Sequence, residues 1–141
     1  MSITNQLARR AKSAHNWLYR RFDKPMFRTV KGMPILLVTV AGRKTGTPST
    51  TPVLYFRDGY AFVVTGSGGG SVEPQWFRNL RKAATASIEV GSERMDVSVR
   101  IARDDEYRRL WERLLEVGPF FEGYRTKAGR DMPIAVLTPI R

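Results

Sequence analysis

The sequence has no cysteine, and among its 141 residues it has only one histidine, His15. The absence of cysteine excludes disulfides, thiolate metal sites and cysteine nucleophiles. A single histidine rules out a metal centre built from several histidines, and it argues against a histidine-based catalytic triad. We therefore expect no metal cofactor.

Long apolar runs are also missing. None approaches the roughly 18 residues that a membrane-spanning helix requires. Residues 1–18 contain no continuous apolar stretch and no small-residue cleavage site, so the start of the chain does not resemble a signal peptide. We expect a cytoplasmic protein, and we leave open a peripheral attachment to the inner face of the cell membrane.

Acidic residues are scarce in the first third of the chain. Residues 1–50 hold ten lysines and arginines but only one acid, Asp23, while the net charge of the whole chain is +11. Such a field attracts polyanions, which include nucleic acid, anionic lipid and multiply charged small ligands. Nucleic acid is disfavoured because the expected strands show no aromatic ladder interleaved with basic residues.

The N-terminal segment has apolar residues near helical spacing and basic residues on its other faces. We expect a helix over 3–22 and a linker over 23–33, so that residues 1–33 precede a domain formed by residues 34–141. The basic helix has two readings: it binds an anionic membrane surface, or it packs on the domain and exposes its charges to water.

The rest of the chain predicts an α+β fold with mostly β structure. Runs rich in apolar and β-branched residues predict six strands, and two segments predict helices. Asp58-Gly59 and Gly91-Ser92 are expected as tight hairpin turns. The expected strands are 35–41, 50–56, 60–65, 86–90, 94–102 and 134–140, and the helices are 74–82 and 104–117. Short connections favour an antiparallel barrel with helices packed outside it.

Two glycine-containing loops follow expected strands. The first, 41–52, places Arg43 and Lys44 between Gly42 and Gly46 and is followed by several hydroxyl side chains. Cations, hydroxyls and backbone N–H groups together bind phosphate. The spacing matches neither the dinucleotide fingerprint nor the P-loop, and a strand follows instead of a helix. The second loop, 66–71, is able to hold the same ligand.

Two groups of aromatic residues follow the second loop in the sequence. Trp76, Phe77 and Leu80 line a pocket or belong to the core, whereas Asn79 among them needs a partner if it is buried. Residues 120–124 wall a pocket or cap the barrel. Because no carboxylate pair or nucleophile stands out, we expect a cofactor to supply the chemistry.

Several motifs keep their order along nearly the whole chain, and together they resemble the deazaflavin-dependent nitroreductase family. The resemblance is carried by Gly42-Arg43-Lys44-Thr45-Gly46 with Pro48 and Pro52, by Arg57-Asp58-Gly59, by Ser67 with Gly69-Gly70, by Trp76 with Asn79-Leu80, by Arg130-x-x-Pro133-Ile134, and by residues 16–21.

This resemblance implies a split β-barrel that binds coenzyme F420, a deazaflavin with a phosphate and a polyglutamate tail. Such a polyanion explains where the positive charge lies. The resemblance implies cofactor contacts from Arg43, Lys44, Thr45, Ser49, Thr50, Thr51, Pro52, Val53, Leu54, Thr65, Gly66, Ser67, Gly68, Gln75, Trp76, Phe77, Arg78 and Asn79. It offers Tyr124 and Ser67 as candidate catalytic side chains.

The activity that the resemblance implies is hydride transfer from reduced F420 to a quinone, an activated enone or a nitroaromatic. Members often place a row of tyrosines where this chain has Gly118, Phe121 and Tyr124, so only Tyr124 keeps a hydroxyl. Gly68 and Ser49 replace a frequent lysine and arginine. We therefore expect a quinone or enone acceptor. The alternative is a barrel that binds flavin mononucleotide (FMN) or a hydrophobic ligand without redox turnover.

Overall fold

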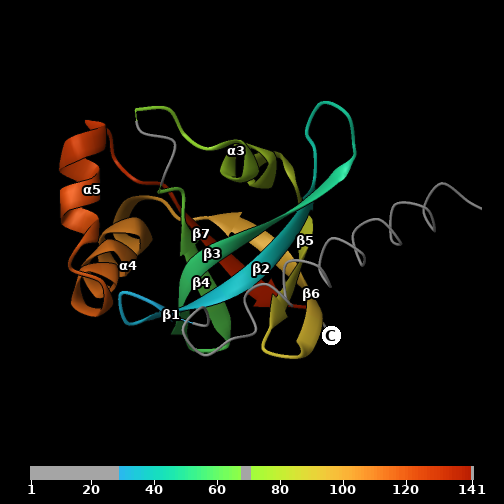
Figure 1. Cartoon of the computed structure of the whole chain (residues 1–141), viewed down its shortest axis with the longest axis horizontal. Coiled ribbons are helices and arrows are strands. Elements are labelled where there is room, and N and C mark those ends of the chain that lie inside the picture. Colours follow the sequence, from blue (N-terminus) through green and yellow to red (C-terminus); the bar gives the residue numbers. More distant parts are fainter. Residues whose placement is uncertain (1–28, 68–70, 141) are drawn as a thin grey trace, which may run out of the picture.

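The computed structural model describes residues 29–67 and 71–140 (Figure 1). The helix expected at 3–22, most of the expected linker and Gly68 lie outside these ranges, so the predictions made for them stay predictions.

Seven strands form the described sheet, and six of them close into a barrel. The strands are β1 (Thr29–Val30), β2 (Met33–Ala41), β3 (Pro48–Asp58), β4 (Ala61–Thr65), β5 (Thr85–Val90), β6 (Glu93–Ile101) and β7 (Ile134–Pro139). Their order is β1-β2-β3-β4-β7-β6-β5, and β2 also pairs with β5, which closes the barrel. All pairs are antiparallel. The predicted six-stranded antiparallel barrel is thus confirmed.

The first hairpin turn differs from its prediction by one residue. Asp58 pairs with Ala61, so the turn consists of Gly59 and Tyr60 instead of Asp58 and Gly59. Gly59 takes a φ of +60°, as the first central residue of a tight hairpin often does. Tyr60, which was expected to begin the next strand, is 80% exposed in this turn.

The barrel interior is filled by alternate residues of the six strands β2 to β7. From β2 it receives Leu36, Val38 and Val40, and the same alternation brings Val53 from β3 and Phe62 from β4 into one cluster. Neighbouring side chains of these strands point outward, since successive residues of a strand face opposite sides. The alternation therefore separates an inner core from an outer face.

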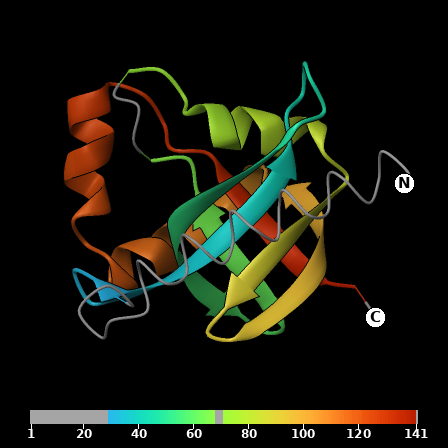
Figure 2. The same ribbon diagram turned by 45° about the vertical axis from the view of Figure 1, so that its right-hand side comes forward.

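Helix α3 (Gln75–Lys82) closes one end of the barrel (Figure 2). Phe77 and Leu80 are completely buried and belong to the interior cluster, with Trp76 packed against it. These two residues are three apart and lie on one face of the helix. The basic residues Arg81 and Lys82 occupy its last turn, which suits the helix dipole.

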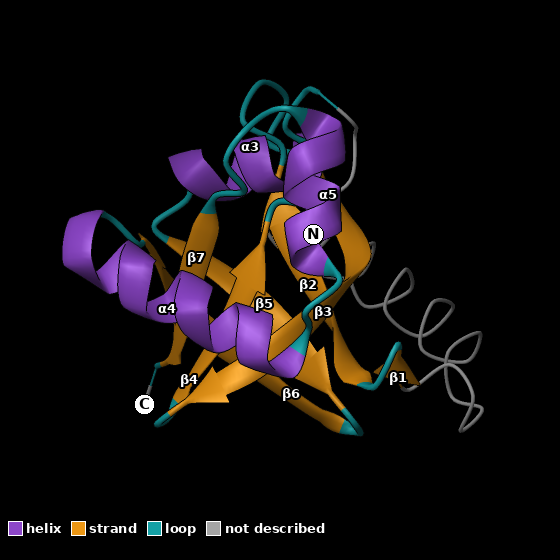
Figure 3. Cartoon of the chain, turned by 90° about the vertical axis from the view of Figure 1, so that its left-hand side faces the viewer, coloured by secondary structure: helices purple, strands orange, loops and turns teal. Residues whose placement is uncertain are grey.

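Two helices cover the outer face of the sheet, as Figure 3 shows. Helix α4 (Asp104–Val117) has the predicted bounds, and helix α5 (Phe121–Ala128) was not predicted. Leu110, Leu114 and Phe121 pack with outward residues of β2, β3, β4 and β7 in a second core cluster. The 120–124 aromatics are therefore partly core, because Phe121 is fully buried.

The two ends of the barrel differ in construction. The α3 end consists of the β2–β3 loop (42–47), the β4–α3 connection and α3. The hairpin end consists of the β3–β4 turn, the β5–β6 turn and the end of β7. Figure 2 shows the two ends on opposite sides of the barrel. Among the described residues, no helix is long and apolar enough to cross a membrane.

Candidate functional site

The β2–β3 loop at the α3 end is closed by its own hydrogen bonds. The Gly42 N–H donates to the Thr47 carbonyl at 2.9 Å, and the Gly46 N–H donates to the Gly42 carbonyl at 2.8 Å. Gly46 takes a φ of +74°, in the region that glycine adopts without strain. The Thr45 hydroxyl accepts a hydrogen bond from the Thr47 N–H at 3.2 Å, so this predicted phosphate ligand also stabilises the loop.

Arg43 is fixed against α3 by a single side chain. The Asn79 Oδ1 atom accepts one hydrogen bond from the Arg43 backbone N–H at 3.1 Å and one from its Nη1 at 2.7 Å. Both bonds are partly buried. The expectation that Asn79 has a polar partner is confirmed, and the partner is the arginine of the first loop. The structure thus joins two predicted site segments that are 36 residues apart.

Positive charge at the α3 end is only partly neutralised. Arg81 forms a bidentate pair with Glu73, at 2.8 and 2.9 Å, and this hydrogen bonding raises the pKa of the guanidinium. In the part of the chain that the structure describes, no carboxylate lies within ion-pair distance of Arg43, Lys44 or Arg78. These three cations are therefore available to an anionic ligand.

The second predicted loop is anchored to the segment before β7. The Pro133 carbonyl accepts hydrogen bonds from the Thr65 hydroxyl at 2.8 Å and from the Gly66 N–H at 3.0 Å. A Cβ atom on Gly66 would lie 2.8 Å from Pro133 Cγ and 3.0 Å from Phe77 Cγ. A side chain at position 66 would force the backbone or these rings to shift, because they pack tightly together.

Arg130 also holds this loop, and the sequence reasoning did not include it among the site residues. Its Nη2 atom donates to the Gly66 carbonyl at 3.1 Å. Arg130 also borders a cavity of about 450 Å³ that is lined by residues of α5 and by the residues directly after it. The signal was present in the Arg130-x-x-Pro133 motif, which carried the family resemblance without suggesting a role.

The predicted contacts on β3 are divided between surface and core. The Thr50 hydroxyl lies 2.7 Å from the Thr39 hydroxyl on the neighbouring strand. Ser49 is exposed, and Val53 is buried in the barrel. Three further residues, Thr51, Pro52 and Leu54, are partly exposed along the same strand.

The remaining predicted contacts follow the same division. Thr65 and Phe77 are buried, so ligand contact there would come from the backbone. Ser67 and Trp76 are partly exposed, and Gln75 is exposed at the start of α3.

Tyr124 lies away from the cations of the α3 end and contacts Lys31 instead. The Lys31 ammonium donates to its hydroxyl at 2.8 Å and lies 4.9 Å from the ring centroids of both Tyr124 and Phe120. Lys31 precedes β2, whereas Arg43 follows it. The first and last residues of this nine-residue strand are eight steps apart, which is roughly 26 Å at about 3.3 Å per residue. The structure therefore groups Arg43, Asn79 and the second loop, but it does not bring Tyr124 to Arg43.

The chemistry of the α3 end is that of an anion site beside an aromatic helix. It offers three cations that have no carboxylate partner within residues 29–67 and 71–140, together with exposed loop hydroxyls and the partly exposed Trp76 ring. Among the described residues, no group of three histidine, cysteine or acidic side chains is placed to hold a metal ion. This arrangement can bind and orient an anionic ring compound, and the hydride chemistry would come from that compound.

Solved structures identify the class of fold. The chain is similar to an F420H2-dependent reductase with a TM-score of 0.66 and 26% identity, over 74% of this chain and 93% of that one. It is also similar to HutZ, the haem storage protein of Vibrio cholerae, with a TM-score of 0.58 and 15% identity, over 90% of this chain and 91% of that one. The second likeness concerns the fold alone, and the fold is the split β-barrel that the family resemblance implied.

Sequence comparisons identify the family. Residues 11–139 match the family model described as F420H2-dependent quinone reductase. An F420H2-dependent quinone reductase of Mycobacterium tuberculosis is 33% identical over 129 residues, which cover 88% of this chain and 87% of the relative. A second protein of that organism, named as a putative enzyme of the same type, is 34% identical over 110 residues, covering 77% and 92%. The chain belongs to the F420H2-dependent quinone reductase family and is an F420-dependent oxidoreductase.

Proposed function

We propose that this protein reduces quinones with a hydride from reduced F420, and that the coenzyme binds at the α3 end of the barrel. The observation that carries the proposal is the attachment of Arg43 to Asn79, next to Lys44 and Arg78, which have no carboxylate partner among the described residues. Quinone as the acceptor is supported by the description of the family and by the names of the relatives.

The residues at the α3 end fit the chemistry of the coenzyme. A phosphate and a chain of glutamates need several cations that are not already neutralised. Arg43, Lys44 and Arg78 would hold these anionic groups, with hydroxyls of the β2–β3 loop as further donors. Asn79 would act as a positioning residue, because it restrains the guanidinium that meets the ligand.

The protein would contribute binding and orientation. When bound, the reduced deazaflavin supplies a hydride to an electron-poor acceptor. Trp76 and the backbone of the 65–67 segment would border the ring system, and the rigid attachment of Gly66 to Pro133 would keep that border in place. Preorganised groups lower the barrier because they need no rearrangement during the reaction. Ser67 and Tyr124 remain the candidate side chains for contact with the reacting atoms.

A titration of the purified protein with oxidised F420, followed by tryptophan fluorescence, tests the coenzyme site. We expect saturable quenching at micromolar coenzyme. Lys44→Ala should weaken binding about tenfold, which is the effect of losing one charge-assisted contact. Lys82→Ala is the matched control, because it removes the same charge from the last turn of α3. Equal curves for the two variants would contradict the assignment.

FMN serves as the competing ligand in the same assay. It has a phosphate but no glutamate tail, so it should bind more weakly than F420, and Lys44→Ala should weaken its binding less than it weakens F420 binding. Tight FMN binding together with no response to F420 would favour the alternative of a flavin-binding barrel.

The acceptor is tested by turnover. Oxidation of reduced F420 is followed with a panel of quinones, activated enones and nitroaromatics at equal concentrations. We expect the highest kcat/KM for a quinone. A clear preference for nitroaromatics would contradict this part of the proposal while leaving the coenzyme site intact.

The basic segment 3–22 lies outside the described residues, and its role stays a prediction. Peripheral attachment to the cytoplasmic face of the membrane would bring the enzyme close to hydrophobic quinones. Co-sedimentation with anionic liposomes, compared between the full chain and a chain lacking residues 1–22, tests this. Equal sedimentation of the two proteins would exclude a role for the segment.

A further inference from the structure

The hairpin end of the barrel contains a cavity that the proposed reaction does not use. Its volume is about 480 Å³, within the range of small-molecule sites. It is lined by residues of the β3–β4 hairpin, the β5–β6 hairpin and the end of β7: Arg57, Tyr60, Phe62, Val90, Glu93, Met95, Thr138 and Pro139. The α3 end is closed by buried residues of a helix, whereas this end has an open hollow.

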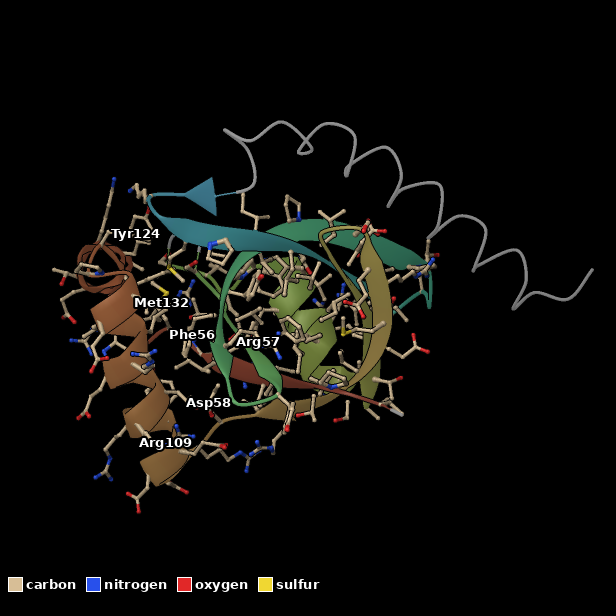
Figure 4. All side chains as sticks on the ribbon, turned by 90° about the horizontal axis from the view of Figure 1, so that it is seen from below. Phe56, Arg57, Asp58, Arg109, Tyr124 and Met132 are labelled. Atoms are coloured by element: carbon tan, nitrogen blue, oxygen red, sulfur yellow. The ribbon has the colours of Figure 1, made fainter. Side chains whose placement is uncertain are left out.

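Among the described residues, Arg57 is the only arginine or lysine that lines this cavity, and its guanidinium contacts two neighbouring residues. Strand β3 turns Val53, Tyr55 and Arg57 to the same side, and the first two belong to or pack against the barrel interior. The Arg57 guanidinium lies 4.0 Å from the ring centroid of Phe62, and its Nη2 donates to the Tyr60 carbonyl at 3.3 Å. In Figure 4, which views this end, Arg57 lies within the ring of strands.

Asp58, the residue next to Arg57, does not neutralise its charge. Asp58 accepts two hydrogen bonds from Arg109 of α4, both at 3.0 Å, and is thereby committed to an ion pair outside the barrel. No carboxylate in the described residues lies within ion-pair distance of Arg57. Most of the five guanidinium N–H donors of Arg57 are therefore left for a ligand.

The other residues that line the cavity indicate what kind of ligand it can bind. Phe62, Val90, Met95 and Pro139 supply apolar surface, and the exposed Tyr60 ring stands at the rim. Glu93 is the one acidic side chain among the lining residues that the structure describes. A fixed guanidinium suits a carboxylate, which it can bind with two parallel hydrogen bonds. The negative charge of Glu93 disfavours a second anionic group.

We infer that the hairpin end binds a small amphipathic monocarboxylate, with its carboxylate on Arg57 and its apolar ring or chain against Phe62 and Met95. The two ends of the barrel would thus select different anions: a polyanion at the α3 end and an apolar monoanion at the hairpin end. The inference does not depend on the proposed function, because no residue is shared between the two sites.

Calorimetric titration of the full chain with 2-naphthoate tests this inference. We expect saturable binding that Arg57→Gln weakens about tenfold or more, as the loss of a charge-assisted pair does. Arg94→Gln is the matched control: it removes the same charge from the same end, but on the outer face, where Arg94 donates to Ser87. Glu93→Gln should strengthen binding. Equal loss in both arginine variants, or no saturable binding, would overturn the inference.

Two further measurements separate a specific site from general apolar binding. The neutral analogue 2-naphthalenemethanol should bind weakly, and Arg57→Gln should change its affinity less than twofold. In protein with 13C-labelled methionine methyls, 2-naphthoate should shift the Met95 signal and leave the signals of Met33 and Met132 unchanged, because both belong to the outer cluster. Lys44→Ala should leave the naphthoate affinity unchanged. A response at Met33 and Met132 alone, or loss of binding in Lys44→Ala, would place the ligand elsewhere and contradict the inference.

Discussion

The two ends of this barrel carry the same kind of charge in different settings. At the α3 end, Arg43 is attached to a helix by Asn79, and the interior behind it is filled by Phe77 and Leu80. At the hairpin end, Arg57 lies on Phe62 beside a hollow of about 480 Å³. A cation beside a filled core presents charge to a ligand on the surface, whereas a cation beside a hollow also offers apolar contact. The surroundings of each arginine therefore decide which anion it can select.

The first prediction concerns the filling of the two ends. Phe77→Ala should lower the free energy of unfolding by about 3–5 kcal/mol, because it leaves a cavity in a closed interior. Met95→Ala should lower the free energy of unfolding by a clearly smaller amount, since Met95 is only partly buried and already borders the cavity at the hairpin end. Urea unfolding measures both. Similar losses would mean that the ends are filled to the same degree.

The second prediction concerns the tight contact of Gly66. Gly66→Ala should destabilise the protein by about 1–3 kcal/mol, because the added methyl would collide with Pro133 and Phe77. Gly123→Ala is the control, since a Cβ at that position meets no atom within 4 Å, and alanine favours a helix. Thermal melting distinguishes the two, and an unchanged Tm in Gly66→Ala would show that the loop can move away.

The third prediction concerns Asn79. Asn79→Ala should destabilise the protein by about 1–3 kcal/mol, because two partly buried donors of Arg43 lose their acceptor. Asn79→Asp should restore stability by an ion pair with Arg43 but should still weaken F420 binding, because the added charge neutralises the site. Fluorescence titration and urea unfolding together check this. Unchanged F420 affinity in Asn79→Asp would remove Arg43 from the coenzyme site.

How far the sequence predicted these features depends on what stabilises each of them. The strands were predictable because alternation is local, and Asn79 was identified because a polar residue among aromatics needs a partner. Helix α5 was missed because Gly118-Pro119 and Gly123 indicate a break. It is held instead by the buried Phe121 and by Gly129, whose φ of +68° ends the helix.

Contacts between distant segments were not predicted, because they depend on residues that are far apart in the sequence. Arg130 acts through the Gly66 carbonyl, 64 residues away. Arg57 was identified only as part of a motif, because the hollow beside it is formed by a second hairpin and the end of the last strand. Each of these arginines lies in a motif of the sequence, but the motif does not indicate which distant segments its side chain contacts.

The last and smallest predicted effect concerns the ion pair beside Arg57. The hydrogen bonds from Arg109 hold the pKa of Asp58 below its ordinary value. The unfolded chain then binds more protons than the folded one in acid, so the contribution of the pair is present above about pH 4 and is lost as the pH falls through the folded pKa. Arg109→Met should therefore reduce stability at pH 7 more than at pH 3. Arg108→Met, which removes a looser pair at 3.7 Å, should show less change with pH in urea unfolding at both pH values.

The central claim is that the coenzyme is held by the cations of the α3 end. A crystal structure of the complex with oxidised F420 tests it most directly. We predict that the phosphate and glutamate groups lie within hydrogen-bonding distance of Arg43 and Lys44. An anionic tail bound at Arg57, on the opposite side of the barrel, would contradict the account.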